Sequence, residues 1–407
     1  MKCCKIRITL QEVIIIFGID YLRKHFTHNQ RYIIVAVLSM FLPFYMCAAV
    51  LLFLLVRLLL NGDIQEAYRQ IPESKFILFF CGLSFVVSLL YKNYIGAACS
   101  IGILAMLSFI LFYRIHISDK LFDFITDLII VLSIFAAIYG LIEYMNILNS
   151  LDIQYFEIRI FNKPKYRINS VFFNANYYAM MIEFFVCLCF YKILKITNFK
   201  EQYKKFFFYA SVILLNLFVL LLTACRTAWP TIAVGILVML LLNKHYKTCF
   251  TILVFTIGLC VYFVFNPTKF PRVDNIIAYF FTRQDIWNIA IQNIKTHPLL
   301  GEGPMTYMHI YSLYGGHPTQ HAHSIYLDPL LCFGILGLAT IAPYVYKHMK
   351  NIHQLYKSKK DPALVSLIIT FIIMIFVHGV LDYTIFFVQT GFLFLLITHS
   401  YTFHESL

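Results

Sequence analysis

Apolar runs long enough to cross a bilayer recur along the whole 407-residue chain, and no other feature limits its possible folds as strongly. A run of about 20 residues in a helix, at about 1.5 Å per residue, spans the roughly 30 Å hydrocarbon core. Only 13% of the residues are charged and 60% are hydrophobic, against about 25% and 45–50% in soluble domains. Because lipid offers no partner to unpaired backbone groups, we expect an all-α polytopic membrane protein.

The apolar runs predict separate spans and one ambiguous stretch. The candidate spans are 75–91, 94–113, 121–145, 177–194, 206–224, 227–243, 247–266, 325–346, 363–381 and 383–401. Residues 32–60 are too long for one upright helix and too short for two full spans. A hinge near Pro43 would give two short helices and 12 spans with both ends inside, whereas one long tilted helix would give 11.

The net charge of +13 comes from basic residues that gather in short loops, such as residues 195–205 and 347–360. Basic loops are expected on the cytoplasmic side, which places residues 146–176, 224–226 and 267–323 outside. The chain has neither a basic groove with interleaved aromatic residues nor zinc-finger spacing, so we expect no nucleic-acid partner.

We expect one membrane domain over residues 1–407, with one large external loop at residues 267–323. In this loop, TRQDIWNIAIQNIKTHP has the apolar spacing of an amphipathic helix that ends before Pro298. The apolar positions are Ile286, Ile289, Ala290 and Ile294. Such a helix would lie on the outer membrane face or fold over a cavity.

Two arginines fall on the predicted outer side. Arg226 lies in TACRTAWP between two apolar runs, where it either caps a helix end by snorkelling or faces an anionic ligand. Arg283 lies in the amphipathic segment, four residues before Trp287. Alone it reads as a solvated surface charge; beside Arg226 it could form the second half of a phosphate clamp.

Three histidines precede the apolar run at 325–346, namely His317, His321 and His323. A neutral imidazole can accept a proton from a hydroxyl near pH 7, so one of them could act as a general base. They could instead bind zinc, or simply form hydrogen bonds at a wet interface. Pro318 disfavours a helix that would align the first two, and neither Glu302 nor Asp328 lies in ligand register, so we predict no metal.

Four short elements follow one another at the predicted outer face. They are Asn174-Ala175-Asn176, Cys225-Arg226-Thr227-Ala228, Arg283 with Trp287, Pro298, Gly301 and Gly303, and His323-Ser324 with Gly334 and Gly337. Together they resemble the motifs of the O-antigen ligase and Wzy-type polymerase superfamily of bacterial membrane glycosyltransferases. The resemblance covers roughly residues 170–382.

Four positions depart from the family pattern. Ala175 stands where proline is common, Cys225 where serine is common, and Ser324 where asparagine is common. Cys332 stands where an acidic residue is common. The last departure leaves His323 without its usual acidic neighbour, so its orientation stays open.

The resemblance implies a GT-C-like fold and transfer of a glycan from undecaprenyl diphosphate to a glycan or lipid-glycan acceptor hydroxyl, with inversion. The transfer would occur on the periplasmic or exterior face of the bacterial cytoplasmic (inner) membrane, in contact with the lipid bilayer. His323 would be the base, and Arg226 and Arg283 would stabilise the leaving diphosphate. No cofactor and no metal are implied. The implied substrate-binding residues are His321, Asn174, Asn176, Trp287 and Ser324.

Two alternatives differ in activity. The spacing from His323 to Gly337 favours a ligase, and a Wzy-type polymerase of O-antigen or capsular polysaccharide is the alternative within the family. Outside the family, a transporter would need polar residues at mid-span. The residues that would support it are Glu183, Asn216, His378 and Asp382, and they form no repeat.

Overall fold

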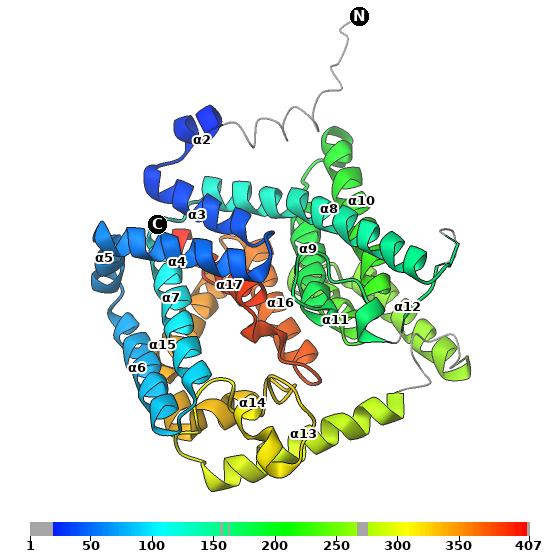
Figure 1. Cartoon of the computed structure of the whole chain (residues 1–407). Helices are drawn as coiled ribbons and strands as arrows, with labels where there is room; N and C mark the ends of the chain where they lie inside the picture. Colours follow the sequence, from blue (N-terminus) through cyan, green and yellow to red (C-terminus); the bar gives the residue numbers. More distant parts are fainter. Residues whose placement is uncertain (1–18, 155–157, 162, 267–275, 405–407) are drawn as a thin grey trace, which may run out of the picture.

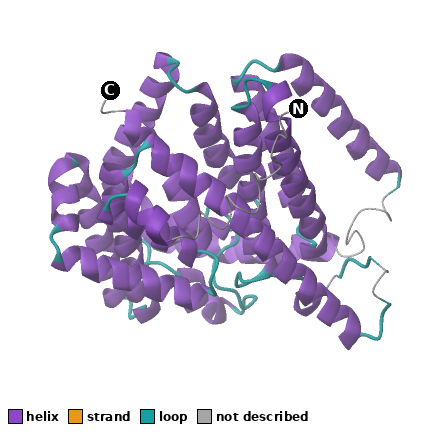
Figure 2. Ribbon diagram, turned by 90° about the horizontal axis from the view of Figure 1, so that it is seen from above, coloured by secondary structure: helices purple, strands orange, loops and turns teal. Residues whose placement is uncertain are grey.

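The computed structural model describes residues 19–154, 158–161, 163–266 and 276–404. All regular elements in these ranges are helices, joined by turns and loops (Figure 2). The predicted all-α class is therefore confirmed. The part of the large external loop at residues 267–275 lies outside the described residues.

The predicted spans overlap observed helices, but their ends differ. The helix predicted at 325–346 continues to Ser358, and the one predicted at 383–401 covers only Val388–Thr398. Helices long and apolar enough to cross a membrane are α6 (Lys75–Leu90, preceded by a short 3-10 turn), α7 (Tyr94–His116), α8 (Asp119–Ser150), α9 (Ala175–Leu194), α10 (Phe199–Thr223) and α15 (Asp328–Ser358). Shorter apolar helices are α11 (Ala228–Leu242), α12 (Tyr246–Phe265) and α16 (Pro362–His378), followed by α17 (Val388–Thr398). These helices make the chain a multi-pass membrane protein, and the total of 11 or 12 spans stays a prediction.

The ambiguous stretch at residues 32–60 is broken in two. Helix α3 (His28–Ser39) ends before Pro43, and α4 (Phe44–Leu60) begins directly after it. Proline lacks an N–H and suits the start of a helix, so the hinge lies where the sequence predicted it. Helix α4 then bends by 80° into α5 (Asp63–Gln70), and α2 (Ile19–His25) precedes α3.

Helix α9 lies at the centre of the fold, packed against α8, α10, α11 and α16 (Figure 1). Almost every side chain from Ala175 to Lys192 is buried, including the ionisable Glu183. A helix that is apolar all round buries itself in this way. The same helix begins at the Asn174–Asn176 element, so the core of the protein holds one predicted site element in place.

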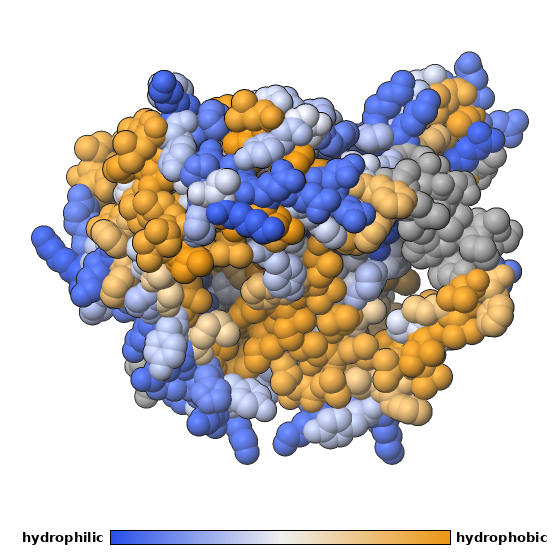
Figure 3. Space-filling model, turned by 90° about the horizontal axis from the view of Figure 1, so that it is seen from below, coloured by the Kyte–Doolittle hydropathy of each residue, from blue (hydrophilic) through white to orange (hydrophobic). Residues whose placement is uncertain are grey.

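The outer surface carries broad apolar areas, with hydrophilic residues gathered at their margins (Figure 3). Large side chains such as Phe53, Phe79 and Phe255 are more than half exposed. In water such an area would mark an aggregation-prone surface; against lipid tails it is the expected surface.

The amphipathic helix of the external loop is α13 (Ile276–Thr296), which lies at one edge of the molecule with the short α14 (Thr306–Ile310) (Figure 1). Its predicted apolar face is buried rather than turned to lipid. Ile286, Ile289 and Ala290 pack into one cluster with residues of α14 and α15. Of the two predicted arrangements, α13 is therefore the one folded over a cavity.

Two of the glycine-containing elements bind each other at a break in α15. Gly334 has φ 59° and ψ −178°, a conformation that is essentially restricted to glycine. The freed amides of Ile335 and Leu336 donate to the carbonyls of Pro298 and Leu299 at 2.9 and 2.8 Å. Gly303 N–H in turn donates to the Cys332 carbonyl at 2.8 Å. The break thus fixes the end of α13 to the helix that follows His323.

We predict that Gly334→Ala destabilises the protein, because its Cβ would meet the Leu299 backbone and its φ is positive. The backbone strain alone is about 1–3 kcal/mol, and thermal unfolding in detergent measures it. Gly82→Ala, at a helical glycine with open space around its Cβ position, is the control. Equal melting temperatures for the two variants would contradict the prediction.

Candidate active site

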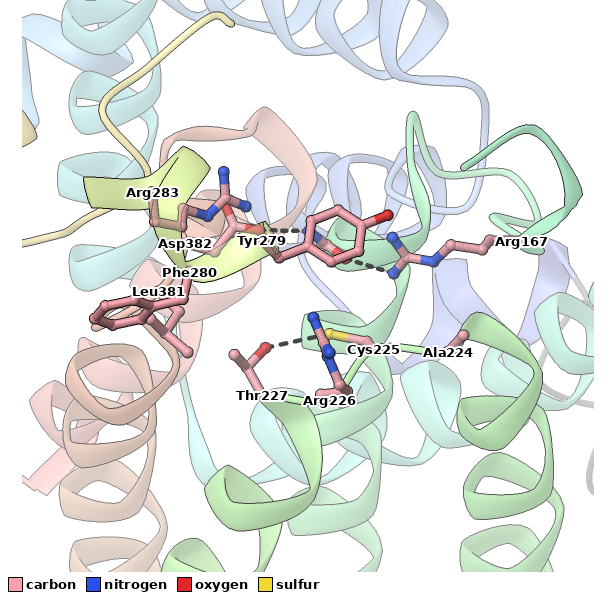
Figure 4. A pocket seen from close by; sticks show the side chains of 11 residues that line it. Arg167, Ala224, Cys225, Arg226, Thr227, Tyr279, Phe280, Arg283, Leu381 and Asp382 are labelled. Carbon is pink, nitrogen blue, oxygen red and sulfur yellow. Dashed lines mark hydrogen bonds between the residues drawn. The ribbon is translucent and has the colours of Figure 1, made fainter. Parts of the chain in front are cut away.

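A cavity of about 330 Å³ opens between α13, the α10–α11 junction and the start of α9 (Figure 4). Its lining residues are Arg167, Asn176, Ala224, Cys225, Arg226, Thr227, Tyr279, Phe280, Arg283, Leu381 and Asp382. Arg226, Arg283 and Asn176 were predicted as site residues from the sequence. The fold therefore brings together these three predicted residues, of which Asn176 and Arg283 are 107 positions apart in the sequence.

Three guanidinium groups approach the cavity from different elements, as Figure 4 shows. Arg283 comes from α13, Arg226 follows the left-handed Ala224 that ends α10, and Arg167 precedes α9. Arg226 lies 5.3 Å from the centre of the Tyr279 ring, a cation–π contact that holds it at the cavity. Arg226 and Arg283 thus form the pair that the sequence predicted, on opposite sides of one space.

Arg283 has no hydrogen bond or ion pair within the described part of the chain. Burial lowers the pKa of its guanidinium, and only the nearby charges of Asp382 and Tyr279 oppose this shift. A cation removed from water with so little compensation gains from binding an anion. The three arginines face one carboxylate, so the cavity carries excess positive charge.

Asp382, in the turn after α16, is the acidic partner of His323. Its Oδ1 accepts from His323 Nδ1 at 2.8 Å and from the Tyr383 N–H at 2.8 Å. A carboxylate at Nδ1 keeps the proton there and leaves Nε2 as the acceptor. In a neutral His323 ring this contact favours the proton on Nδ1, so that Nε2 carries the lone pair that a general base would use.

The Asp382 carboxylate also connects His323 to the cavity. Its Oδ2 accepts from Asn176 Nδ2 at 2.5 Å, and Asn176 Oδ1 accepts from Arg167 at 2.6 Å. Burial raises the pKa of Asp382, but the adjacent, hydrogen-bonded His323 ring, with His321 and Arg283 nearby, outweighs burial and holds the pKa well below its usual value. Asp382 stays ionised and lines the cavity itself, whereas His323 does not.

His321 is buried beside the base and stays neutral. Its Nδ1 accepts from the backbone N–H of His323 at 3.2 Å, and its Nε2 lies 3.3 Å from the Tyr177 hydroxyl. Burial and the neighbouring His323 lower its pKa to about 3, against the opposing effect of Asp382. A histidine that cannot gain a proton near neutral pH orients its neighbours and is a poor base.

The hydroxyl of Thr319 contacts the second ring nitrogen of His323. Thr319 Oγ1 lies 2.9 Å from His323 Nε2, and since Nδ1 carries the ring proton, the hydroxyl donates. This is the hydrogen bond that an acceptor hydroxyl would have to make before deprotonation. Thr319 was not predicted from the sequence.

Other predicted residues lie away from the cavity lining. Asn174 caps α9, accepting from the N–H groups of Asn176 and Tyr177. Ser324 is buried and accepts from the Tyr326 N–H at 3.3 Å. Trp287 packs against the α13–α14 cluster, and its buried Nε1 has no hydrogen-bond partner among the described residues. His317 is exposed.

The expectation that His323 lacks an acidic neighbour is wrong. Cys332 has a thiol where the family commonly has a carboxylate, and this thiol donates to Asp328 Oδ2 at 3.5 Å. The acidic neighbour of His323 is Asp382, which lies 59 residues further along the chain. The two come together because the Gly379 carbonyl accepts from the Ile325 N–H at 2.8 Å, which holds the end of α16 against the segment that contains His323. From the sequence, Asp382 appeared only as a possible transporter residue.

Arg167 was also missed. It is one of four basic residues in the loop predicted outside, at 146–176, and no motif distinguishes it from the other three. Its Nε donates to the Thr223 carbonyl at 2.7 Å, so it joins the end of α10 to the start of α9.

One group of side chains could hold a metal ion. Among the described residues, the donor atoms of His321, His323 and Asp382 lie within 4.8 Å of one another. They are also hydrogen-bonded directly, through the 2.8 Å contact between His323 and Asp382. The direct contact satisfies the base and its acid without an ion, and the absence of a metal stays a prediction.

One family model matches part of the chain. Residues 209–342 match the family model described as O-antigen ligase, which confirms the resemblance predicted from the sequence motifs. The matched segment includes Arg226, Arg283 and His323, while Arg167, Asn176 and Asp382 lie outside it. A search of curated proteins found no match.

We predict that Asp382→Asn abolishes most activity while the protein still accumulates in the membrane. The amide no longer favours the proton on His323 Nδ1, so Nε2 loses its basic tautomer; the same change costs about 10⁴-fold in the Ser-His-Asp triad of serine proteases. Glycan transfer by the purified variant is the measurement. Asp285→Asn, at an exposed carboxylate on the same helix as Arg283, should leave transfer unchanged. Full activity of Asp382→Asn would contradict the role of the dyad.

Proposed function

We propose that this protein is an O-antigen ligase-like glycosyltransferase. It would move a glycan from undecaprenyl diphosphate to an acceptor hydroxyl at the outer face of the bacterial cytoplasmic membrane. The observation that carries this proposal is one arginine-lined cavity whose single acidic wall residue, Asp382, holds the His323 base. The family match over residues 209–342 supports the same reaction class.

The cavity suits the diphosphate of the donor lipid. Guanidinium groups form charge-assisted, forked hydrogen bonds with phosphate oxygens, and these bonds strengthen as negative charge develops on the leaving group. Arg226 and Arg283 would bind the two phosphates from opposite sides, and Arg167 would add a third positive charge. With such a set of counter-charges, we propose that the transfer needs no metal.

His323 would deprotonate the acceptor. The acceptor hydroxyl would displace Thr319 and donate its proton to Nε2, while its oxygen attacks the anomeric carbon of the donor sugar. The bond between that carbon and the diphosphate breaks, and the diphosphate leaves with the electron pair. A single displacement of this kind inverts the anomeric configuration. Asp382 stabilises the imidazolium that forms.

The acceptor distinguishes the two activities within the family. A ligase passes the glycan to a different lipid-glycan, and a Wzy-type polymerase passes it to a growing polysaccharide. The register of His323, Gly334 and Gly337 favours the ligase. Loss of one polymer in a deletion strain would separate the two activities.

Purified protein should transfer glycan from undecaprenyl diphosphate to a suitable acceptor equally well with and without a chelator. The physical reason is that the arginines supply the positive charge that a divalent ion would otherwise provide. Product formation by mass spectrometry is the measurement. Chelator-sensitive transfer that Mg²⁺ or Zn²⁺ restores would overturn the metal-free reaction, and transport of the intact donor without bond cleavage would overturn the enzyme.

We also predict that Arg226→Ala, Arg283→Ala and His323→Ala each abolish transfer without lowering the amount of protein in the membrane. Arg283→Lys should recover little, because an ammonium group cannot make a forked contact with phosphate. Lys295→Ala, at an exposed cation on the same helix, is the control. Transfer at the wild-type rate by Arg283→Lys would show that a simple positive charge is sufficient.

A further inference from the structure

Glu183 and His378 form a buried pair that the proposed reaction does not use. Glu183 lies within α9 and His378 ends α16, and neither side chain has any exposed surface. His378 Nδ1 lies 2.6 Å from Glu183 Oε1, and the other carboxylate oxygen has no hydrogen-bond partner in the part of the chain that the structure describes. Ionisable groups inside a membrane protein are costly and are kept mainly at functional sites.

The buried pair reaches the cavity through Thr227. His378 Nε2 lies 3.4 Å from Thr227 Oγ1, and Thr227 lines the cavity next to Arg226. Figure 4 shows the hydroxyl to the left of the Arg226 side chain, with Cys225 Sγ as its other neighbour at 3.2 Å. The hydroxyl therefore connects the interior pair to the space between the arginines.

The Thr227 hydroxyl does not cap the helix that Thr227 begins. Thr227 has helical backbone angles, φ −66° and ψ −26°, at the start of α11, whereas a capping threonine has a non-helical backbone. Its side chain makes no capping bond, and Oγ1 is turned towards His378. The hydroxyl is therefore not needed to satisfy the start of the helix.

The proton positions follow from the partners. The Glu183 carboxylate is fully buried against His378, so we infer that the ring is the imidazolium that balances its charge. Nδ1–H then faces Glu183 and Nε2–H donates to Thr227 Oγ1, whereas a neutral ring would accept from the hydroxyl. The hydroxyl hydrogen must then point to the Cys225 sulfur or into the cavity. Sulfur is a weak acceptor, and a phosphate oxygen between the arginines would be a far stronger one. The pair thus prepares a donor aimed at an anion.

We propose that Glu183 and His378 are positioning residues that hold the Thr227 hydroxyl as a hydrogen-bond donor to the diphosphate of the donor lipid. The proposal rests on the proposed function and adds to it a neutral donor between the arginines. No covalent bond changes at Thr227, because its proton is shared in a hydrogen bond and stays on the oxygen.

The test compares Thr227→Val, which keeps the shape and removes the hydroxyl, with Thr227→Ser, which keeps the hydroxyl. Losing one hydrogen bond to a charged group corresponds to about 10- to 100-fold in kcat/KM, and we expect this loss for Thr227→Val alone. The kcat/KM of Thr227→Ser should stay within about threefold of the wild-type value, a smaller change than the loss of one hydrogen bond would cause. Equal activity of Thr227→Val and the wild type would overturn the proposal.

A second variant tests the buried pair through its coupling to Thr227. Glu183→Gln keeps the size but offers no negative charge to the His378 ring, so it should also lower kcat/KM. If the pair acts through the hydroxyl, the double variant with Thr227→Val is no worse than Thr227→Val alone. Losses that multiply would show that Glu183 acts only on packing, and the positioning role would fail.

A matched control and a binding assay separate this proposal from the proposed function. Ser366→Ala removes the 2.7 Å Asn243–Ser366 bond between the same helices, α11 and α16, at their opposite ends, and transfer should not change. Binding of farnesyl diphosphate to the purified protein is measured in parallel. If the wild type binds the diphosphate but transfers no glycan, the proposed function fails, and weaker binding by Thr227→Val still supports the donor. Equal binding by both proteins would overturn it.

Discussion

The structure of this site depends on one buried carboxylate. Asp382 is surrounded by donors from three separate segments: the His323 ring, the Asn176 amide and its own neighbour's backbone N–H. A carboxylate out of water must be compensated in this way, because an unpaired charge costs several kcal/mol. The compensation brings the histidine segment, the start of α9 and the end of α16 to one point. The same contacts set the tautomer of the base and form the wall of the cavity.

The arginines depend on this arrangement as well. In an apolar protein their charges are weakly screened, so three of them near one cavity repel each other unless an anion is present. Asp382 compensates one charge, and the carbonyl of Thr223 and the side chain of Asn176 hold Arg167 in place. The remaining positive charge is the reason that we propose a diphosphate as the ligand of this cavity.

Local patterns in the sequence predicted most of the fold. The apolar runs marked the helices, Pro43 marked the hinge between α3 and α4, and the spacing of Ile286, Ile289 and Ala290 marked the buried face of α13. These signals are local, since helix length, proline geometry and apolar periodicity depend on neighbouring residues. The motif residues Arg226, Arg283 and His323 were found in the same way, because each lies within a short recognisable element.

The sequence by itself determined the all-α membrane class, the approximate positions of most helices and the motifs that contain Arg226, Arg283 and His323. Only the tertiary structure decided which acid serves His323, that Arg167 joins the cavity, and that Thr319 and Thr227 direct their hydroxyls to histidines. These pairings join residues from separate loops and helices. They follow from how α9, α13 and α16 pack, and a single sequence records the polarity of each side chain but not its partner across the fold.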